Sequence, residues 1–180
     1  MSTTATTPDL RYPVGKFSYE GPFGEDKRRE LIQQIADVPA RMRAAVAGLN
    51  DAQLNTPYRD GGWTVRQVVH HIVDSHMNSY IRFRWALTEN EPAIKVYDEK
   101  TWAELSDAKS APIELSLGLL EALHARWIVL LRALTPEDWK KTLQHPEAGL
   151  MTLDKLLGLY AWHGRHHVAH VTALRERMGW

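Results

Sequence analysis

The chain contains no cysteine, no excess of charge of either sign and no apolar run long enough to cross a bilayer. Without cysteine it cannot form a disulfide, a zinc site built on thiolates or a cysteine nucleophile. Its 22 basic residues balance 22 acidic ones, so nothing indicates a basic surface for a nucleic-acid backbone. The first residues lack the basic start and apolar stretch of a secretory signal. We therefore expect a cytoplasmic protein that binds neither nucleic acid nor membrane.

Four long stretches carry apolar residues at helical spacing, and no segment shows a convincing strand pattern. They span roughly residues 26–49, 64–87, 112–134 and 152 onward. The second has the clearest start, because Thr64 and Gln67 fit a capping box, and Thr152 can cap the last. The long connection over residues 88–112 predicts one short helix near Lys100–Leu105 and offers a lid for a site in the bundle.

Residues 1–24 contain several prolines, glycines and threonines and predict an extended N-terminal arm without a core of its own. Residues 25–180 then form a single domain. Four helices of this length predict an all-α fold, a four-helix bundle whose facing side chains can build a central site.

The chain contains nine histidines, and seven of them fall in two clusters. In the late cluster, His163 and His167 are one helical turn apart and share a face, so they can hold one metal ion together. On a helical wheel His170 lies on the same edge and competes with them, whereas His166 points further outward. A third ligand can come from the early cluster, which contains His70, His71 and His76. Spacing alone leaves a surface histidine cluster as an equal alternative.

At these residues the chain resembles the DinB/YfiT family of metalloenzymes, most closely its YfiT-type members, which are described as metal-dependent hydrolases. The resemblance extends from about Tyr12 to Trp180. Its most distinctive segments are Thr56–Phe83, Tyr97–Lys100, His145–Glu147 and Trp162–His170.

The resemblance implies a four-helix bundle that holds one divalent ion, Zn²⁺ or alternatively Ni²⁺, through three histidines and water. The family's first ligand is a histidine followed by Ile or Leu and three residues before Asp, which is His71; His70 is its neighbouring decoy. The family's HxxxH pair falls on His163 and His167. Gly164 stands where relatives carry other small or polar residues. YfiT-type proteins are also described as homodimers, which we carry over as an expectation.

Three histidines leave open coordination positions, where a bound water becomes acidic enough to attack an ester or amide. We therefore expect a metal-dependent hydrolase of a small-molecule substrate. A metal-dependent thiol transferase is the alternative, because DinB-like relatives are linked to transfer of low-molecular-weight thiols such as bacillithiol. A metal-binding stress or structural protein without turnover is a third possibility. Weaker candidates for the site are Arg59, Asp74, Asn78, Arg82 and His145.

Overall fold

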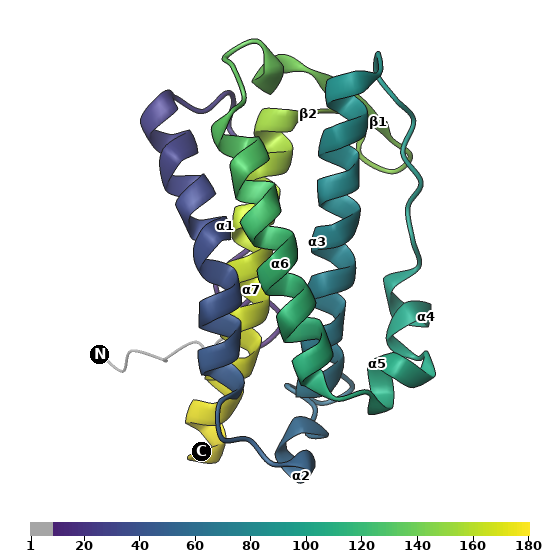
Figure 1. Cartoon of the computed structure of the whole chain (residues 1–180). Coiled ribbons are helices and arrows are strands. Elements are labelled where there is room, and N and C mark those ends of the chain that lie inside the picture. Colours follow the sequence, from purple (N-terminus) through teal and green to yellow (C-terminus); the bar gives the residue numbers. More distant parts are fainter. Residues whose placement is uncertain (1–8) are drawn as a thin grey trace, which may run out of the picture.

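The computed structural model describes residues 9–180 and shows four long helices packed as a bundle (Figure 1). These are α1 (Glu25–Val46), α3 (Val65–Thr88), α6 (Ile113–Arg132) and α7 (Leu153–Met178). Helices α1 and α3 lie at opposite corners, because each packs along both α6 and α7. The predicted all-α four-helix bundle is confirmed. None of the described helices is long and apolar enough to span a membrane.

The helix starts follow from local hydrogen bonding. The Thr64 hydroxyl accepts from the backbone N–H of Gln67 at 3.2 Å, and the Gln67 amide oxygen accepts from the backbone N–H of Thr64 at 2.9 Å. This is the expected capping box at the start of α3. At the start of α7, the Thr152 hydroxyl accepts from the backbone N–H of Lys155. Both caps fix where the histidine-bearing helices begin, and hence the height of each histidine in the bundle.

The connections contain shorter elements. They are α2 (Asp51–Leu54), α4 (Glu99–Ala103), α5 (Ser106–Ser110), a 3₁₀ helix η1 (Asp138–Lys140), β1 (Thr142–His145) and β2 (Gly149–Thr152). The connection over residues 88–112 thus holds two short helices rather than one. The two strands pair as an antiparallel hairpin, so the expectation of no strand was wrong here. Strands of four residues are too short to show alternation, and one face of this hairpin is only partly buried.

Residues 9–24 form no helix or strand and lie against α7. Their anchor is the buried carboxylate of Asp154 in the first turn of α7. It accepts hydrogen bonds from the Tyr19 hydroxyl at 3.0 Å and the backbone N–H of Phe23 at 2.8 Å, and it pairs with Arg28 at 2.6 Å. The remainder of the predicted arm, residues 1–8, lies outside the described residues.

The core consists of two apolar clusters with a polar layer between them. One cluster includes Ile35, Phe83, Trp127 and Leu157, and the other includes Met42, Ile72, Leu120 and Val171. On α3, α6 and α7, the residues between these clusters are buried histidines and serines: Ser75, His76, Ser79, His124, His166, His167 and His170. The candidate site is therefore a layer through the interior of the bundle.

Candidate metal centre

Three histidines from two helices converge in this layer. His71 comes from α3, and His163 and His167 come from successive turns of α7. Each offers one ring nitrogen, and the three nitrogens lie within 4.8 Å of one another. The structure thus brings together the three residues singled out from the sequence, in the composition of a three-histidine metal site.

Burial keeps these imidazoles neutral. It lowers the pKa of His71 to about 4, with a smaller contribution from His166. Burial and the neighbouring histidines hold the pKa values of His163 and His167 well below the ordinary value of 6.5. A neutral imidazole has the free lone pair that a metal ion requires, so the donor set fits a divalent ion at neutral pH.

A chain of hydrogen bonds, which we call the His124 relay, determines which nitrogen of His163 is free. The backbone carbonyl of Ile35 can only accept, so the His124 ring must donate to it through Nδ1, at 2.8 Å. The Nε2 of His124 then accepts from Nδ1 of His76 at 2.9 Å. In turn, Nε2 of His76 accepts from Nδ1 of His163 at 3.1 Å. The relay therefore leaves the lone pair of His163 on Nε2.

A second chain, the His170 relay, acts on His167. The carbonyl of Arg11, in the N-terminal arm, lies 3.3 Å from Nε2 of His170 and must accept from it. The Nδ1 of His170 then accepts from Nδ1 of His167 at 3.4 Å. This again leaves the free lone pair on Nε2. Such outer partners orient the ring of a metal-ligating histidine and raise its basicity.

His71 is held differently. Its ring lies against the indole of Trp63, with ring centroids 4.5 Å apart. Within residues 9–180, no hydrogen bond fixes its tautomer. The α3 contribution to the site therefore depends on packing, and the α7 contribution on directional hydrogen bonds.

The adjacent His70 faces another part of the molecule. Its Nδ1 lies 2.7 Å from the Ser116 hydroxyl and its Nε2 lies 3.2 Å from the Ala111 carbonyl. Both ring nitrogens thus have protein partners, as expected for a histidine that binds no metal. Asp74 shares a small pocket with His70 and not with the three histidines, and burial raises its pKa to about 6.

His166 was predicted to point outward, and this was wrong: it is 7% exposed. Its ring stacks on Trp162 with centroids 4.4 Å apart, and Tyr12 of the N-terminal arm covers it. The helical wheel places His166 correctly on the helix, but it contains no information about the arm that lies over that side of α7.

The three histidines open onto a pocket of about 410 Å³. Arg59 and Trp63 line this pocket, and so do Glu99 and Lys100 of α4. The helix α4, in the connection that was expected to offer a lid, therefore lines part of this pocket. Of the weaker candidates, Arg59 lines this pocket, Arg82 and His145 line the neighbouring one, and the Asn78 amide instead donates to the backbone carbonyl of Asp74.

Comparisons with known proteins identify the family of this chain. The sequence model of the DinB superfamily matches residues 34–171, which is most of the chain. The chain belongs to the DinB superfamily. A protein from Bacillus mycoides strain KBAB4, named "Putative metal-dependent hydrolase", is 56% identical over 96% of this chain and 99% of its own length. A relative of the same name from Bacillus cereus strain 03BB102 is 57% identical over the same shares.

Two solved structures match the fold. YfiT from Bacillus subtilis, described as a probable metal-dependent hydrolase with an unusual four-helix bundle topology, superposes with a TM-score of 0.93. It is 52% identical, and the match covers 95% of this chain and 98% of that one. TT2238, described as a four-helix bundle protein, is 20% identical with a TM-score of 0.57 over 81% of this chain and 98% of its own. This second likeness shows the fold alone. The names of the relatives and the three-histidine cluster together support a bound metal ion.

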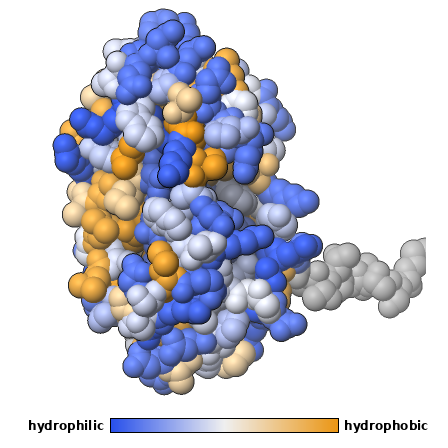
Figure 2. Space-filling model, turned by 90° about the vertical axis from the view of Figure 1, so that its right-hand side faces the viewer, coloured by the Kyte–Doolittle hydropathy of each residue, from blue (hydrophilic) through white to orange (hydrophobic). Residues whose placement is uncertain are grey.

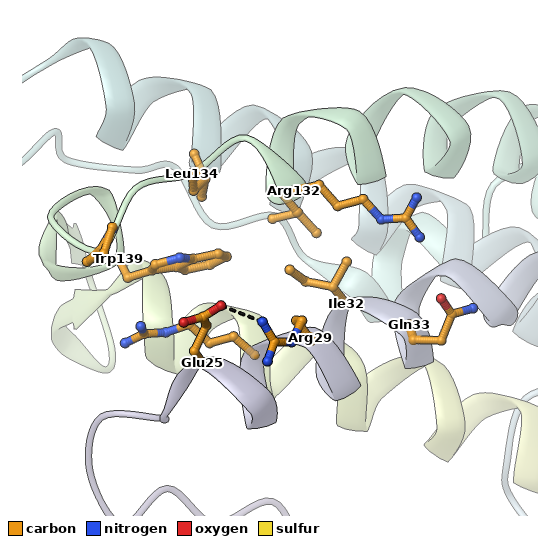
Figure 3. Close-up of a pocket in the computed structure, with 10 residues that line it drawn as sticks. Glu25, Arg29, Ile32, Gln33, Arg132, Leu134 and Trp139 are labelled. Atoms are coloured by element: carbon orange, nitrogen blue, oxygen red, sulfur yellow. Dashed lines mark hydrogen bonds and ion pairs between the residues drawn. The ribbon is translucent and has the colours of Figure 1, made fainter.

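Another groove of this DinB-superfamily chain lies away from the histidines. It has a volume of about 630 Å³ and lies between the start of α1 and the end of α6. Figure 3 shows Trp139 and Ile32 beside an ion pair of Glu25 with Arg29. No histidine lines it, so we assign the chemistry to the histidine layer.

Sequence reasoning missed His124, which anchors the longer relay. The signal was present, because Leu117, Leu120, His124, Trp127 and Leu131 form one helical stripe, and a histidine inside an apolar stripe needs a buried partner. The partner, a backbone carbonyl on α1, could not be read from the sequence.

Proposed function

We propose that this protein is a metal-dependent hydrolase in which His71, His163 and His167 hold one divalent ion. The observation that carries the proposal is the convergence of three neutral imidazoles at the edge of an open pocket. An ion bound there lowers the pKa of a coordinated water toward about 7 and polarises the bond to be broken. The two relays keep Nε2 of His163 and His167 directed at the ion, while α4 limits access of bulk water.

We propose zinc as the metal, with nickel as the alternative. Neutral imidazole suits both ions, and three histidines with an open position are a common catalytic zinc environment. Affinity alone does not determine which ion a cell supplies.

A thiol transferase remains the second candidate, because the cavity has room for the second substrate that it requires. The histidine pocket adjoins another pocket of about 770 Å³, and together they can hold a cosubstrate beside the substrate. Since the chain contains no cysteine, the nucleophile would be an external low-molecular-weight thiol.

Elemental analysis of untagged protein, purified without chelator, tests the metal site. We expect about one zinc or nickel ion per chain in the parent and sharply lower occupancy in His71→Ala, His163→Ala and His167→Ala. His70→Ala is the matched control and should keep its metal. Loss in His70→Ala with retention in His71→Ala would invert the ligand register.

The metal-loaded parent then separates the two reactions. An ester is supplied alone, and in parallel an electrophile such as 1-chloro-2,4-dinitrobenzene is supplied with and without a thiol. Turnover of the ester without thiol supports the hydrolase. Turnover that requires added thiol supports the transferase and rejects simple hydrolysis.

We also propose that the protein is a homodimer. Along α6, the side chains of Leu115, Leu119 and Val129 are 68%, 48% and 71% exposed. Helix α6 lies at the front of the molecule in Figure 1, which is the left edge in Figure 2. Apolar side chains gather along that edge. Such a patch is typical of a protein–protein interface. Sedimentation equilibrium of the parent and of Leu119→Glu tests this, since the substitution should yield a monomer.

The cytoplasmic location stays a prediction.

A further inference from the structure

A second pocket, which we call the Arg82 pocket, adjoins the candidate metal centre. It shares His163, Glu99 and Lys100 with the histidine pocket. Its floor consists of the buried side chains of Ser75, Arg82 and Tyr160, and its walls include Tyr97 of the connection and His145 of β1. It lies on the side of the molecule that carries α4, which is largely hydrophilic in Figure 2.

Arg82 is a buried cation with poor protein partners. It is 7% exposed, and within residues 9–180 no carboxylate lies within 4.0 Å of its guanidinium. Its Nε has no hydrogen-bond acceptor there. Its Nη atoms make only long contacts of 3.4 Å, to the Tyr160 hydroxyl and to the Lys95 carbonyl. Burying a charge without compensating groups is unfavourable, so this guanidinium is suited to bind an anion.

Another arginine of the same helix shows how a purely structural guanidinium is satisfied. Arg66 is equally buried, at 6% exposed. It donates to the Asn55 amide oxygen, the Ala111 carbonyl and the Asp51 carboxylate, all at 3.1 Å or less. Arg82 has no such set, and it faces a pocket.

The other groups around Arg82 also donate hydrogen bonds. The buried Tyr97 hydroxyl has no partner within the described residues, and burial raises its pKa so that it keeps its proton. His145 accepts two backbone N–H groups at Nδ1, from Glu147 and Ala148. Burial and the positive charge of Arg82 lower the pKa of His145, so its neutral ring carries the proton on Nε2.

The acidic groups of the pocket do not neutralise this floor. The Asp98 carboxylate caps α4 by accepting from the backbone N–H groups of Lys100 and Thr101 and from the Thr101 hydroxyl. Glu99 and Glu147 are exposed at the rim, where they outnumber the exposed Lys100. The pocket therefore combines a donor-rich, positively charged floor with an acidic rim.

We propose that the Arg82 pocket binds a carboxylate of the substrate or thiol cosubstrate while the reacting end of that molecule lies at His71, His163 and His167. A carboxylate matches the planar guanidinium and can accept from Tyr97 and His145 as well. A phosphate dianion fits less well, because the floor offers one cation and the rim is acidic. The inference rests on the proposed metal site for the position of the reacting end.

The distance between the two ends suits a small molecule. Contacts of 3.4, 3.5 and 3.4 Å lead from Nε2 of His163 to the Ser75 hydroxyl, to the Tyr160 hydroxyl and to Nη1 of Arg82. A molecule with a reactive group a few bonds from a carboxylate can therefore reach both.

A matched pair of thiols tests the proposal in cobalt-loaded protein, where the thiolate-to-cobalt absorption band reports binding. The probes are 3-mercaptopropionate and 3-mercaptopropanamide, which differ in the negative charge. We expect the parent to prefer the carboxylate by about 10- to 100-fold, the usual contribution of hydrogen bonds to a charged group. Arg82→Gln should abolish that preference and leave the affinity for the amide unchanged. Arg84→Gln, an exposed arginine of the same helix, should keep the preference.

Other variants and probes test the proposal if the first variant does not fold or cobalt does not bind. If Arg82→Gln does not fold, Arg82→Lys and Tyr97→Phe should each reduce the preference. If cobalt does not bind, glutarate against glutaramide, followed by tryptophan fluorescence, still tests the Arg82 pocket, and elemental analysis decides the metal site separately. Equal binding of charged and neutral probes by the parent, or a preference that persists in Arg82→Gln, would overturn the inference.

Turnover measurements show whether the electrophile or the thiol cosubstrate carries the carboxylate. Comparison of the 4-nitrophenyl monoester of glutarate with 4-nitrophenyl butyrate reports a carboxylate on the electrophile. A preference seen only among thiols, with the electrophile held constant, places the carboxylate on the thiol cosubstrate. Both results require the same dependence on Arg82.

Discussion

The two sides of the metal centre are built on different physical principles. On α7, His163 and His167 each donate to a further histidine, and each chain ends on a backbone carbonyl. On α3, His71 is held by contact with Trp63 and has no hydrogen-bonded partner within the described residues. The α7 side is thus oriented before any ion arrives, whereas the α3 side completes the set.

This difference explains why one interior layer contains so many histidines. A neutral imidazole can accept a hydrogen bond at one nitrogen and donate one at the other. A chain of such rings therefore fixes the orientation of a metal-ligating histidine without burying a charge. A carboxylate in that position would add a buried negative charge, which is unfavourable unless paired. The cost is a core with many groups that gain protons readily once exposed.

The largest effect is therefore expected from pH, measured on metal-free protein. Burial lowers the pKa of His71, His124, His166 and His170 to about 4. Between pH 6.5 and 4 the unfolded chain binds protons that the folded chain does not, so the free energy of unfolding falls as the pH falls. Each such group contributes up to about 1.4 kcal/mol per pH unit. Urea unfolding at pH 7.5, 6 and 5 should show a steep loss.

One group opposes this trend. The raised pKa of Asp74, about 6, makes the folded chain bind an extra proton below that pH, which stabilises it there. Its effect on the free energy of unfolding offsets that of a single histidine. A free energy of unfolding that stays constant from pH 7.5 to 5 would contradict the buried, neutral histidine layer on which the comparison of the two sides depends.

The next effect concerns the relays. His124→Leu removes the acceptor for His76, so His163 loses its fixed orientation, and zinc affinity should fall about 10- to 100-fold. His124→Gln can still donate and accept and should lose less. Competition with a chromophoric chelator measures both. The same pair of substitutions at His170 tests the side of His167, and equal affinities in all variants would show that the relays do not orient the ligands.

The smallest effect is expected at His70, one residue from the α3 ligand. His70→Gln should leave zinc affinity within about twofold of the parent, because its ring bonds to Ser116 and Ala111 and not to the site. Loss of those hydrogen bonds should reduce the free energy of unfolding by about 1 kcal/mol. A large change in affinity with unchanged stability would mean that the two neighbouring histidines have exchanged roles.

Helix positions and caps could be predicted from the sequence because they depend on neighbouring residues. Thr64, Gln67 and Thr152 act locally, and the apolar stripes repeat within each helix. The convergence of His71 with the α7 pair required the family resemblance, since spacing left His70, His71 and His76 as alternatives.

The rest depends on contacts between distant segments. The arm that buries His166, the α1 carbonyl that ends the His124 relay and the floor around Arg82 come from parts of the chain far apart in sequence. Gly164 is a similar case, because a Cβ at this position would lie 2.4 Å from a methyl carbon of Val38 on α1. Such packing constraints are properties of the assembled bundle.

The His170 relay ends on the N-terminal arm and so connects the arm to the metal centre. The Arg11 carbonyl accepts from His170, and the Gly15 carbonyl accepts from the indole of Trp162 at 3.0 Å. If an ion on His167 strengthens its bond to His170, it also strengthens the hold on Arg11, and by thermodynamic linkage a docked arm strengthens metal binding to the same degree. The arm thereby becomes a reporter of the interior: trypsin cleavage after Arg11 or Lys16 would proceed at a rate set by the occupancy of the metal centre.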